Sequence, residues 1–228
     1  LSWSMETNSY YLKNVYHRYI NLSFKLEKPK WENIKRTFSE EQKVGSEYYD
    51  IKDKGDTDVY VCDTPENDKK VTEFLDRFNL FYDSKLLFNT KADDSIKVHI
   101  DNNKEEDYSD KPDNFIDNHA KLNFTWEVPG GGLRWWELKN NKNLTVDTHT
   151  QKNGKKWHVI WAKQEDCTMV YEKTINKPSI VNTGVPHSTH NPSKKERFTL
   201  SYNLVRKTDL KLVTFFEALW LFDGLLEA

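Results

Sequence analysis

Four side chains of the types that hold a metal ion and a small anion occur in two parts of the sequence. Residues 99–101 read His-Ile-Asp, and His187 is followed ten residues later by Arg197. Two imidazoles and one carboxylate are typical of a mononuclear non-haem Fe(II) centre, which keeps coordination positions open for oxygen and a substrate. Beside such a centre, the planar fork of an arginine could bind a small dicarboxylate.

The His-Ile-Asp triplet ends a segment, residues 96–101, that we expect to be a β-strand. Because side chains alternate along a strand, the apolar residues of this segment share one face, and His99 and Asp101 share the other. The two side chains are then about 7 Å apart along the strand, so both could reach one ion.

The second imidazole follows a bend. A strand expected at residues 179–182 runs into a turn containing Gly184 and Pro186, and His187 begins the next extended piece. His190, three residues further on, is a rival ligand. The Gly-x-Pro bend and the offset to the arginine favour His187, and we interpret His190 as a loop residue or a neighbour of the site.

The arginine begins a segment of regular alternation, residues 197–205. Its aromatic and aliphatic residues fall on one face, and Arg197, Thr199 and Ser201 fall on the other. An arginine followed by two hydroxyl groups on one polar face predicts a pocket for a carboxylate.

The second half of the chain is rich in short strand patterns separated by turn signals. Strands are expected at residues 96–101, 120–128, 133–138, 144–148, 157–162, 167–173, 179–182 and 197–205. Short strands in such close succession predict a double-sheet jelly roll or a barrel.

The remaining segments suggest a scaffold around these strands. Residues 66–80 have helical periodicity, residues 47–51 and 58–62 resemble strands, and the apolar segment 209–226 predicts a helix. This last helix could pack on the barrel or join two subunits in a homodimer. We expect a single domain with three parts: a mixed α/β scaffold at residues 1–94, a strand core at 95–206 and the terminal helix at 207–228.

Composition limits the classes of function. The chain has 228 residues, a formal net charge of −2 and no basic stripe, so an obligate nucleic-acid partner is not expected. We recognise no apolar run of membrane length and no secretory signal. Cys62 and Cys167 lie far apart without metal-ligand spacing, which predicts two reduced thiols and a cytoplasmic location.

His99-x-Asp101, the distal His187 and Arg197-x-Thr199 together resemble the signature of the Fe(II)- and 2-oxoglutarate-dependent dioxygenases. Residues 121–124, 135–137 and 182–187 further resemble bacterial and marine-phage members of that family. The likeness covers roughly residues 95–205, and the first 90 residues carry no family motif that we recognise.

The resemblance implies an α+β, mainly β fold: a double-stranded β-helix, which is a jelly-roll or cupin-like barrel, with flanking helices. It further implies that His99, Asp101 and His187 hold Fe(II) and that Arg197 binds the distal carboxylate of 2-oxoglutarate. Thr199 stands where the family often has serine and keeps a hydroxyl group available to the same carboxylate.

The implied reaction uses O2 to decarboxylate 2-oxoglutarate to succinate and oxidises a second substrate, with hydroxylation as the default outcome. Halogenation is disfavoured because that branch of the family replaces the carboxylate ligand with a small residue, whereas Asp101 is present. The prime substrate, a small molecule or a peptidyl group, is left open. A bacterial cell or a phage-infected host is the implied setting.

Other residues give weaker indications. Asn123 could donate to the co-substrate or bond one strand to another, and one of Trp135 and Trp136, which alternate in direction, could contact substrate. His119, directly before a strand, is expected to be solvated. The acidic residues 102–118 form either a surface loop or a lid, and a lid of that charge would favour a cationic or neutral substrate.

Two other classes of protein fit the same residues. A cupin-like binding protein could keep the barrel and its ligands without turnover. A viral structural or interaction protein could use the terminal helix to assemble a larger particle. Metal and co-substrate binding, followed by succinate formation, would separate these alternatives from an oxygenase.

Overall fold

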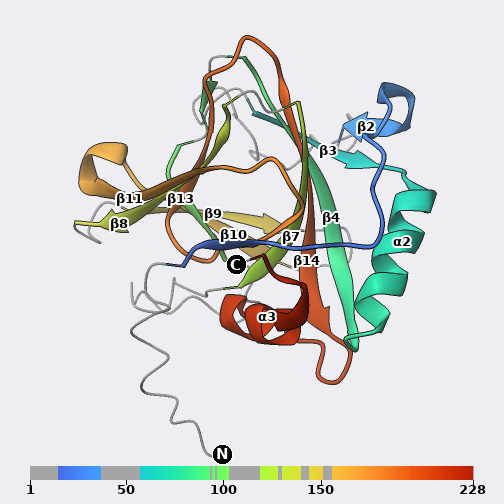
Figure 1. The fold of residues 1–228 in the computed structure, drawn as a ribbon. Coiled ribbons are helices and arrows are strands. Elements are labelled where there is room, and N and C mark those ends of the chain that lie inside the picture. The colour runs from blue at the N-terminus through green and yellow to red at the C-terminus, as the bar shows by residue number, and fades with distance from the viewer. Residues whose placement is uncertain are drawn as a thin grey trace, which may run out of the picture.

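The computed structural model describes residues 15–36, 57–92, 94–95, 97–102, 119–127, 130–139, 144–150 and 156–227. These residues form a mainly β structure of antiparallel sheets with two α-helices, α2 (Pro65–Asp76) and α3 (Phe215–Leu221) (Figure 1). Short 3-10 helices occur at Trp31–Asn33, Gln164–Asp166 and Asp223–Leu225. The strand predicted at 47–51 and most of the predicted acidic connection at 102–118 lie outside the described residues.

The first sheet has β14 at its centre, paired with β7 on one side and β4 on the other. Every pairing in it is antiparallel. In spatial order its strands are β1 (His17–Tyr19), β12 (Ser179–Asn182), β7 (Ala120–Trp126), β14 (Arg197–Arg206), β4 (Leu80–Thr90), β3 (Thr57–Cys62) and β2 (Ile34–Arg36).

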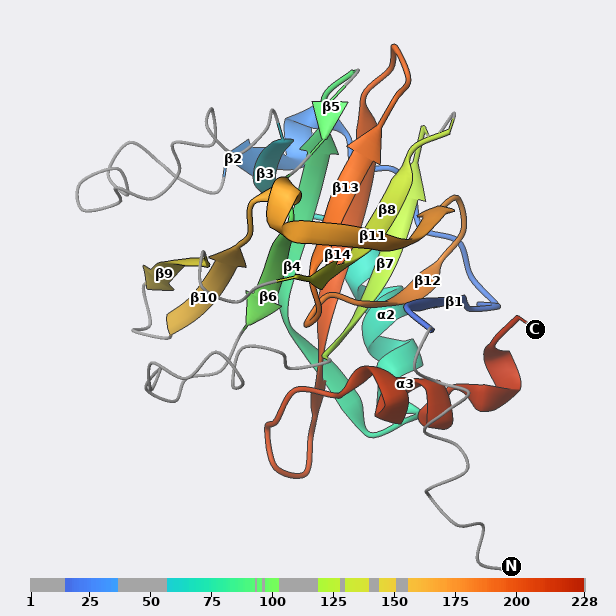
Figure 2. The ribbon, with the colours of Figure 1, turned by 90° about the vertical axis from the view of Figure 1, so that its left-hand side faces the viewer.

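The second sheet, seen in Figure 2, is also antiparallel and carries the His-Ile-Asp triplet. In spatial order its strands are β11 (Cys167–Thr174), β8 (Gly132–Leu138), β13 (His187–Asn191), β6 (His99–Asn102), β10 (Lys156–Trp161) and β9 (Thr145–Thr150). The short strand β5 (Asp94–Ser95) pairs with β13.

The largest apolar core lies between the first sheet and the helices. Helix α2 begins with Pro65 and buries Val71, Phe74 and Leu75, the spacing that places three side chains on one face. They join one cluster with the aromatic and aliphatic residues of β14 and with α3. Alternation therefore leaves the other face of β14, which begins with Arg197, directed away from this core, as predicted.

The longest strand in the described structure, β4, was not predicted. The sequence pattern continues a helix to residue 80, whereas α2 ends at Asp76, Asn79 has a left-handed φ of 57° and Leu80 begins β4. Asp83-Ser84-Lys85 resembles a turn because it is polar. In the structure Lys85 forms an ion pair of 2.6 Å with Asp68 of α2, so the polar residues bond to neighbouring elements instead of ending the strand.

The predicted terminal helix is shorter than residues 209–226. Leu210 has a φ of 59° in the turn before it, and Thr214 begins α3 through a capping box with Glu217. Trp220 of α3 has 77 % of its surface exposed. A homodimer through this helix stays a prediction.

The division of the chain at residue 95 also stays a prediction, although β3 and β4 bring residues before that boundary into the main sheet.

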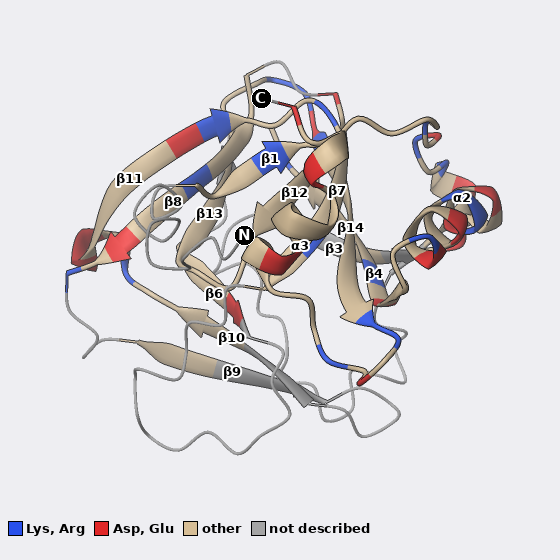
Figure 3. Cartoon of the chain, turned by 60° about the horizontal axis from the view of Figure 1, so that its bottom comes forward, with Lys and Arg blue, Asp and Glu red and all other residues tan. Residues whose placement is uncertain are grey.

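Acidic and basic residues are interleaved along α2 (Figure 3). Cys62 and Cys167 are buried free thiols, as expected. Within the described ranges, no helix is both long enough and apolar enough to cross a membrane.

Candidate metal centre

The three predicted ligands meet because two short strands lie side by side. His99 begins β6, His187 begins β13, and the two residues are direct partners across these strands. Asp101 follows His99 by two residues and therefore shares its face. One ligand atom from each of the three side chains lies within 4.8 Å of the others. A possible metal-binding site is thus formed by His99, Asp101 and His187.

Backbone hydrogen bonds fix the orientation of both imidazoles. The Nδ1 atom of each ring lies 2.9 Å from a carbonyl oxygen two residues earlier in the chain, that of Lys97 for His99 and that of Val185 for His187. A carbonyl can only accept a hydrogen bond, so Nδ1 carries the proton and Nε2 keeps its lone pair. The Nε2 atoms lie 3.8 Å and 4.0 Å from the two oxygens of Asp101, so all three donors converge.

The charges of the three groups suit a divalent cation. Burial lowers the pKa of both imidazoles, that of His187 to about 3, so both are neutral at physiological pH. Burial alone would raise the pKa of the Asp101 carboxyl, but the nearby Lys121 ammonium holds it below its ordinary value. Two neutral imidazoles and one carboxylate are already in the protonation state that metal binding needs.

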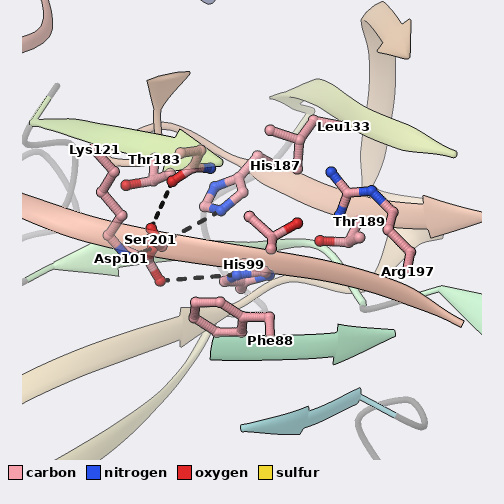
Figure 4. Close-up of a pocket in the computed structure, with 12 residues that line it drawn as sticks. Phe88, His99, Asp101, Lys121, Leu133, Thr183, His187, Thr189, Arg197 and Ser201 are labelled. Atoms are coloured by element: carbon pink, nitrogen blue, oxygen red, sulfur yellow. Dashed lines mark hydrogen bonds and ion pairs between the residues drawn. The ribbon is translucent and has the colours of Figure 1, made fainter. Parts of the chain in front are cut away.

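The ligands open into a pocket of about 60 Å³ between the two sheets (Figure 4). The first sheet contributes side chains of β4, β7 and β14, and the second sheet contributes the ligands and their neighbours. The lining residues are Phe88, His99, Asp101, Lys121, Asn123, Leu133, Thr183, His187, Thr189, Arg197, Thr199 and Ser201.

Arg197 is a buried cation in this pocket. Its exposed fraction is 2 %, and its Nε atom has no hydrogen-bond partner within the described ranges. Burial lowers the pKa of its guanidinium to about 10, which still leaves it charged at neutral pH. A buried charge without a counter-ion is costly, so this end of the pocket is suited to a carboxylate or another anion.

The other predicted co-substrate residues also line the pocket. Thr199 and Ser201 lie on the same face of β14 as Arg197. Asn123 is the partner of Ser201 across β7 and β14, and its Oδ1 accepts a hydrogen bond of 2.6 Å from the Ser201 hydroxyl. The structural bond that was one interpretation of Asn123 is therefore present, and the residue still faces the pocket.

Five lining residues were not singled out from the sequence. Alternation could have found two of them, because Lys121 precedes Asn123 by two residues and Thr189 follows His187 by two. Phe88 comes from β4, the strand that was not predicted, and Leu133 carried no sequence signal. Thr183 lies within the segment 182–187 that resembles the family, but no role was assigned to it.

The two tryptophans are placed in the core instead of the pocket. The indole N–H of Trp135 donates to the backbone oxygen of Asn182 over 2.9 Å, and that of Trp136 donates to the hydroxyl of Ser188 over 2.9 Å. Both side chains are buried, and neither lines the pocket. The expectation that one of them contacts substrate there is not supported by this geometry.

Two further histidines can now be placed. His190 is partly exposed and does not line the pocket, because alternation turns it away from the face that carries His187. His119 was expected to be solvated, which is wrong. Its exposed fraction is 1 %, its Nε2 lies 3.2 Å from the hydroxyl of Thr183, and its backbone bridges to Thr214 directly before β7.

No family model and no curated protein matches the chain. Among solved structures, the chain is similar to the crystal structure of an acetylacetone dioxygenase from Acinetobacter johnsonii, with 12 % sequence identity and a TM-score of 0.28. The alignment covers 90 % of this chain and 94 % of that one.

Proposed function

We propose that this protein is an Fe(II)- and 2-oxoglutarate-dependent oxygenase. One observation carries the proposal: a buried arginine without a counter-ion among the described residues lines the same small pocket as a His-Asp-His ligand set. The ligand set suits Fe(II), and the arginine suits the far carboxylate of a dicarboxylic acid that also reaches the metal.

The strand pairings support a double-stranded β-helix as the fold. Eight strands, taken in chain order, are β4, β6, β7, β8, β11, β12, β13 and β14. The first pairs with the eighth, the second with the seventh, the third with the sixth and the fourth with the fifth. This is the pairing expected when a long antiparallel ribbon folds into a jelly roll. The β9–β10 hairpin is inserted between the fourth and fifth strands and extends the second sheet next to β6.

The proposed roles follow from position in the pocket. His99, Asp101 and His187 would hold the iron, and Arg197 would bind the distal carboxylate of 2-oxoglutarate with the hydroxyl groups of Thr199 and Ser201 beside it. When bound, iron and 2-oxoglutarate supply the oxidising chemistry, in which O2 converts 2-oxoglutarate to succinate and a substrate is oxidised. The protein's own tasks are to orient these groups and to exclude water.

We propose hydroxylation as the outcome, since the carboxylate ligand is present at Asp101. A cupin-like binding protein without turnover, or a viral interaction protein, is the alternative. Binding of metal and 2-oxoglutarate without succinate formation would favour the binding protein.

The proposal is tested with Arg197→Met in an anaerobic titration of 2-oxoglutarate into the Mn(II)-loaded protein. Loss of a charge-assisted pair at a buried site corresponds to a Kd increase of about 30-fold or more. Arg134→Met is the matched control, because Arg134 is partly exposed and pairs with Glu172 outside the pocket. Metal affinity should be unchanged in both variants.

Supplied with Fe(II), 2-oxoglutarate, ascorbate and air, the wild-type protein should release succinate slowly even when no prime substrate is present. An Arg197→Met variant that binds 2-oxoglutarate as tightly as the wild type would overturn the assignment of this residue. Failure of the wild type to bind 2-oxoglutarate in the presence of metal would overturn the proposed function.

A further inference from the structure

Lys121 places a second buried cation in the pocket, and it belongs to neither the ligand set nor the proposed 2-oxoglutarate site. Its exposed fraction is 8 %, and it comes from β7, two residues before Asn123 and on the same face. Its Nζ lies 2.5 Å from Oδ2 of Asp101. A lysine is seldom buried without a partner, and Asp101 is the partner here.

Lys121 and Arg197 lie at opposite ends of the pocket. Lys121 pairs with Asn203 of β14, six residues beyond Arg197, which corresponds to about 20 Å along the strand. Figure 4 shows the imidazoles of His99 and His187 between the two cations. If 2-oxoglutarate lies between the metal and Arg197, then Lys121 borders the side of the metal that the co-substrate leaves open.

The ammonium group of Lys121 has more N–H donors than Asp101 uses. It carries three N–H groups, and within the described ranges Asp101 is its hydrogen-bond partner. Because Lys121 lines the pocket, the remaining donors are available to a ligand there. A carboxylate could accept from them while Asp101 continues to accept from the third.

The charges of the assembled site point the same way. Asp101 and Lys121 cancel each other, and a divalent metal cancels the two charges of 2-oxoglutarate. Among the described residues of this largely buried pocket, Arg197 then leaves one positive charge, and an uncompensated buried charge is unfavourable. One further negative charge would balance the site.

We propose that the prime substrate of this enzyme is a small molecule or chain end bearing a free carboxylate, and that Lys121 binds this carboxylate. The inference rests on the proposed function, because it assigns the open side of the metal to the substrate. This proposal differs from the expectation of a cationic or neutral substrate. That expectation rested on the acidity of residues 102–118, most of which lie outside the described structure.

A structural role alone would have a different signature. If Lys121 only holds Asp101 in position, its loss weakens the metal site and affects every ligand of the pocket to the same extent. If it binds a carboxylate, its loss removes the preference for an acid over the matching uncharged amide. The ratio of these two affinities therefore separates substrate binding from positioning.

Acetate and acetamide are suitable probes, because both are small and differ in charge. Their Kd values are measured from the paramagnetic relaxation of their methyl protons by the Mn(II)-loaded protein saturated with 2-oxoglutarate, which occupies the Arg197 end. We expect the wild type to bind acetate about tenfold or more tightly than acetamide, the ratio expected for one charge-assisted hydrogen bond. Lys121→Met should bring the ratio close to one.

Two further variants complete the test. Lys121→Arg should keep most of the preference, because a guanidinium also pairs with a carboxylate. Lys177→Met, at an exposed lysine paired with Glu227, should leave the wild-type ratio unchanged. Equal binding of acetate and acetamide by the wild type would overturn the inference, as would a Lys121→Met variant that keeps the wild-type ratio.

The same samples separate this inference from the proposed function. Saturation with 2-oxoglutarate is measured first, and its failure counts against the oxygenase. If the protein binds 2-oxoglutarate but shows no preference for acetate over acetamide, the proposed function stands and the proposed role of Lys121 is wrong.

Discussion

His99 and His187 face each other across neighbouring antiparallel strands, with their ring centroids 4.3 Å apart. The same backbone bond, from Nδ1 to the carbonyl two residues earlier, orients both rings. Strand pairing therefore sets the distance between the ligands, and the local hydrogen bonds set their direction. Because both imidazoles are already oriented in the metal-free protein, less conformational entropy is lost when the metal binds.

The metal centre should stabilise the protein in a manner that depends on His187. We expect Mn(II) or Fe(II) at a thousand times its Kd to raise the free energy of unfolding by about 4 kcal/mol. His187→Ala should abolish this increase, because it removes one of three ligands. Thermal unfolding under anaerobic conditions, with and without metal, measures the effect.

His190→Ala is the control for this measurement. His190 is three residues along the same strand but does not line the pocket, so the metal-dependent stabilisation should remain at its wild-type value. If the two variants lose the stabilisation equally, His187 is not a specific ligand.

Gly131 should matter to the co-substrate even though it carries no side chain. A Cβ atom at this position would meet the Arg197 Cδ at 3.1 Å and the backbone oxygen of His190 at 3.0 Å. The backbone of His190 belongs to β13 and yields less readily than the stem of the arginine. Gly131→Ala should therefore displace Arg197 and raise the Kd for 2-oxoglutarate about tenfold, a shift of about 1.4 kcal/mol.

The matched control is Gly224→Ala, because nothing lies within 4 Å of a Cβ at Gly224. Metal affinity should be the same in the wild type and both variants, since Gly131 does not contact the ligands. Unchanged 2-oxoglutarate binding in Gly131→Ala would show that Arg197 accommodates the methyl group without loss.

Much of the site could be predicted from the sequence because alternation is a local property. A period of two assigns Arg197, Thr199 and Ser201 to one face of a strand without knowledge of its neighbours. The same rule joins His99 to Asp101. It cannot say which strand lies next to which, so the direct pairing of His99 with His187 became visible only in the structure.

The parts that were missed depend on partners distant in sequence. Strand β4 was missed in part because Lys85 is paired with Asp68 of a helix, and the burial of His119 depends on Thr183. Aromatic residues were ambiguous for the same reason. Whether Trp136 faces a ligand or the core is decided by Ser188 on the neighbouring strand, which the sequence does not reveal.

Trp136 should contribute to stability and not to ligand binding. Trp136→Phe removes the indole donor, leaves the buried Ser188 hydroxyl without this partner and reduces packing, so unfolding should become easier by about 1–3 kcal/mol. Urea unfolding measures this loss. The Kd for 2-oxoglutarate should stay at the wild-type value. A selective change in that Kd would indicate that Trp136 takes part in ligand binding.

His17 should make the metal-free protein less stable as the pH falls. It is buried against the rings of Trp135 and Tyr171, and burial, with a smaller effect of Lys173 and Arg18, lowers its pKa from 6.5 to about 4. Between these values the unfolded chain binds more protons than the folded one. The free energy of unfolding is therefore unaffected by His17 above pH 6.5 and falls between pH 6.5 and pH 4, by up to about 3 kcal/mol.

His17→Phe tests this dependence, because phenylalanine keeps an aromatic ring between Trp135 and Tyr171 but cannot be protonated. Urea unfolding of the metal-free protein is compared at pH 7 and at pH 4.5. His187 is also neutral in the folded chain and contributes to the same slope, so the variant should lose part of the pH dependence and keep the rest. A variant with the full wild-type slope would show that His17 is protonated in the folded protein at pH 4.5.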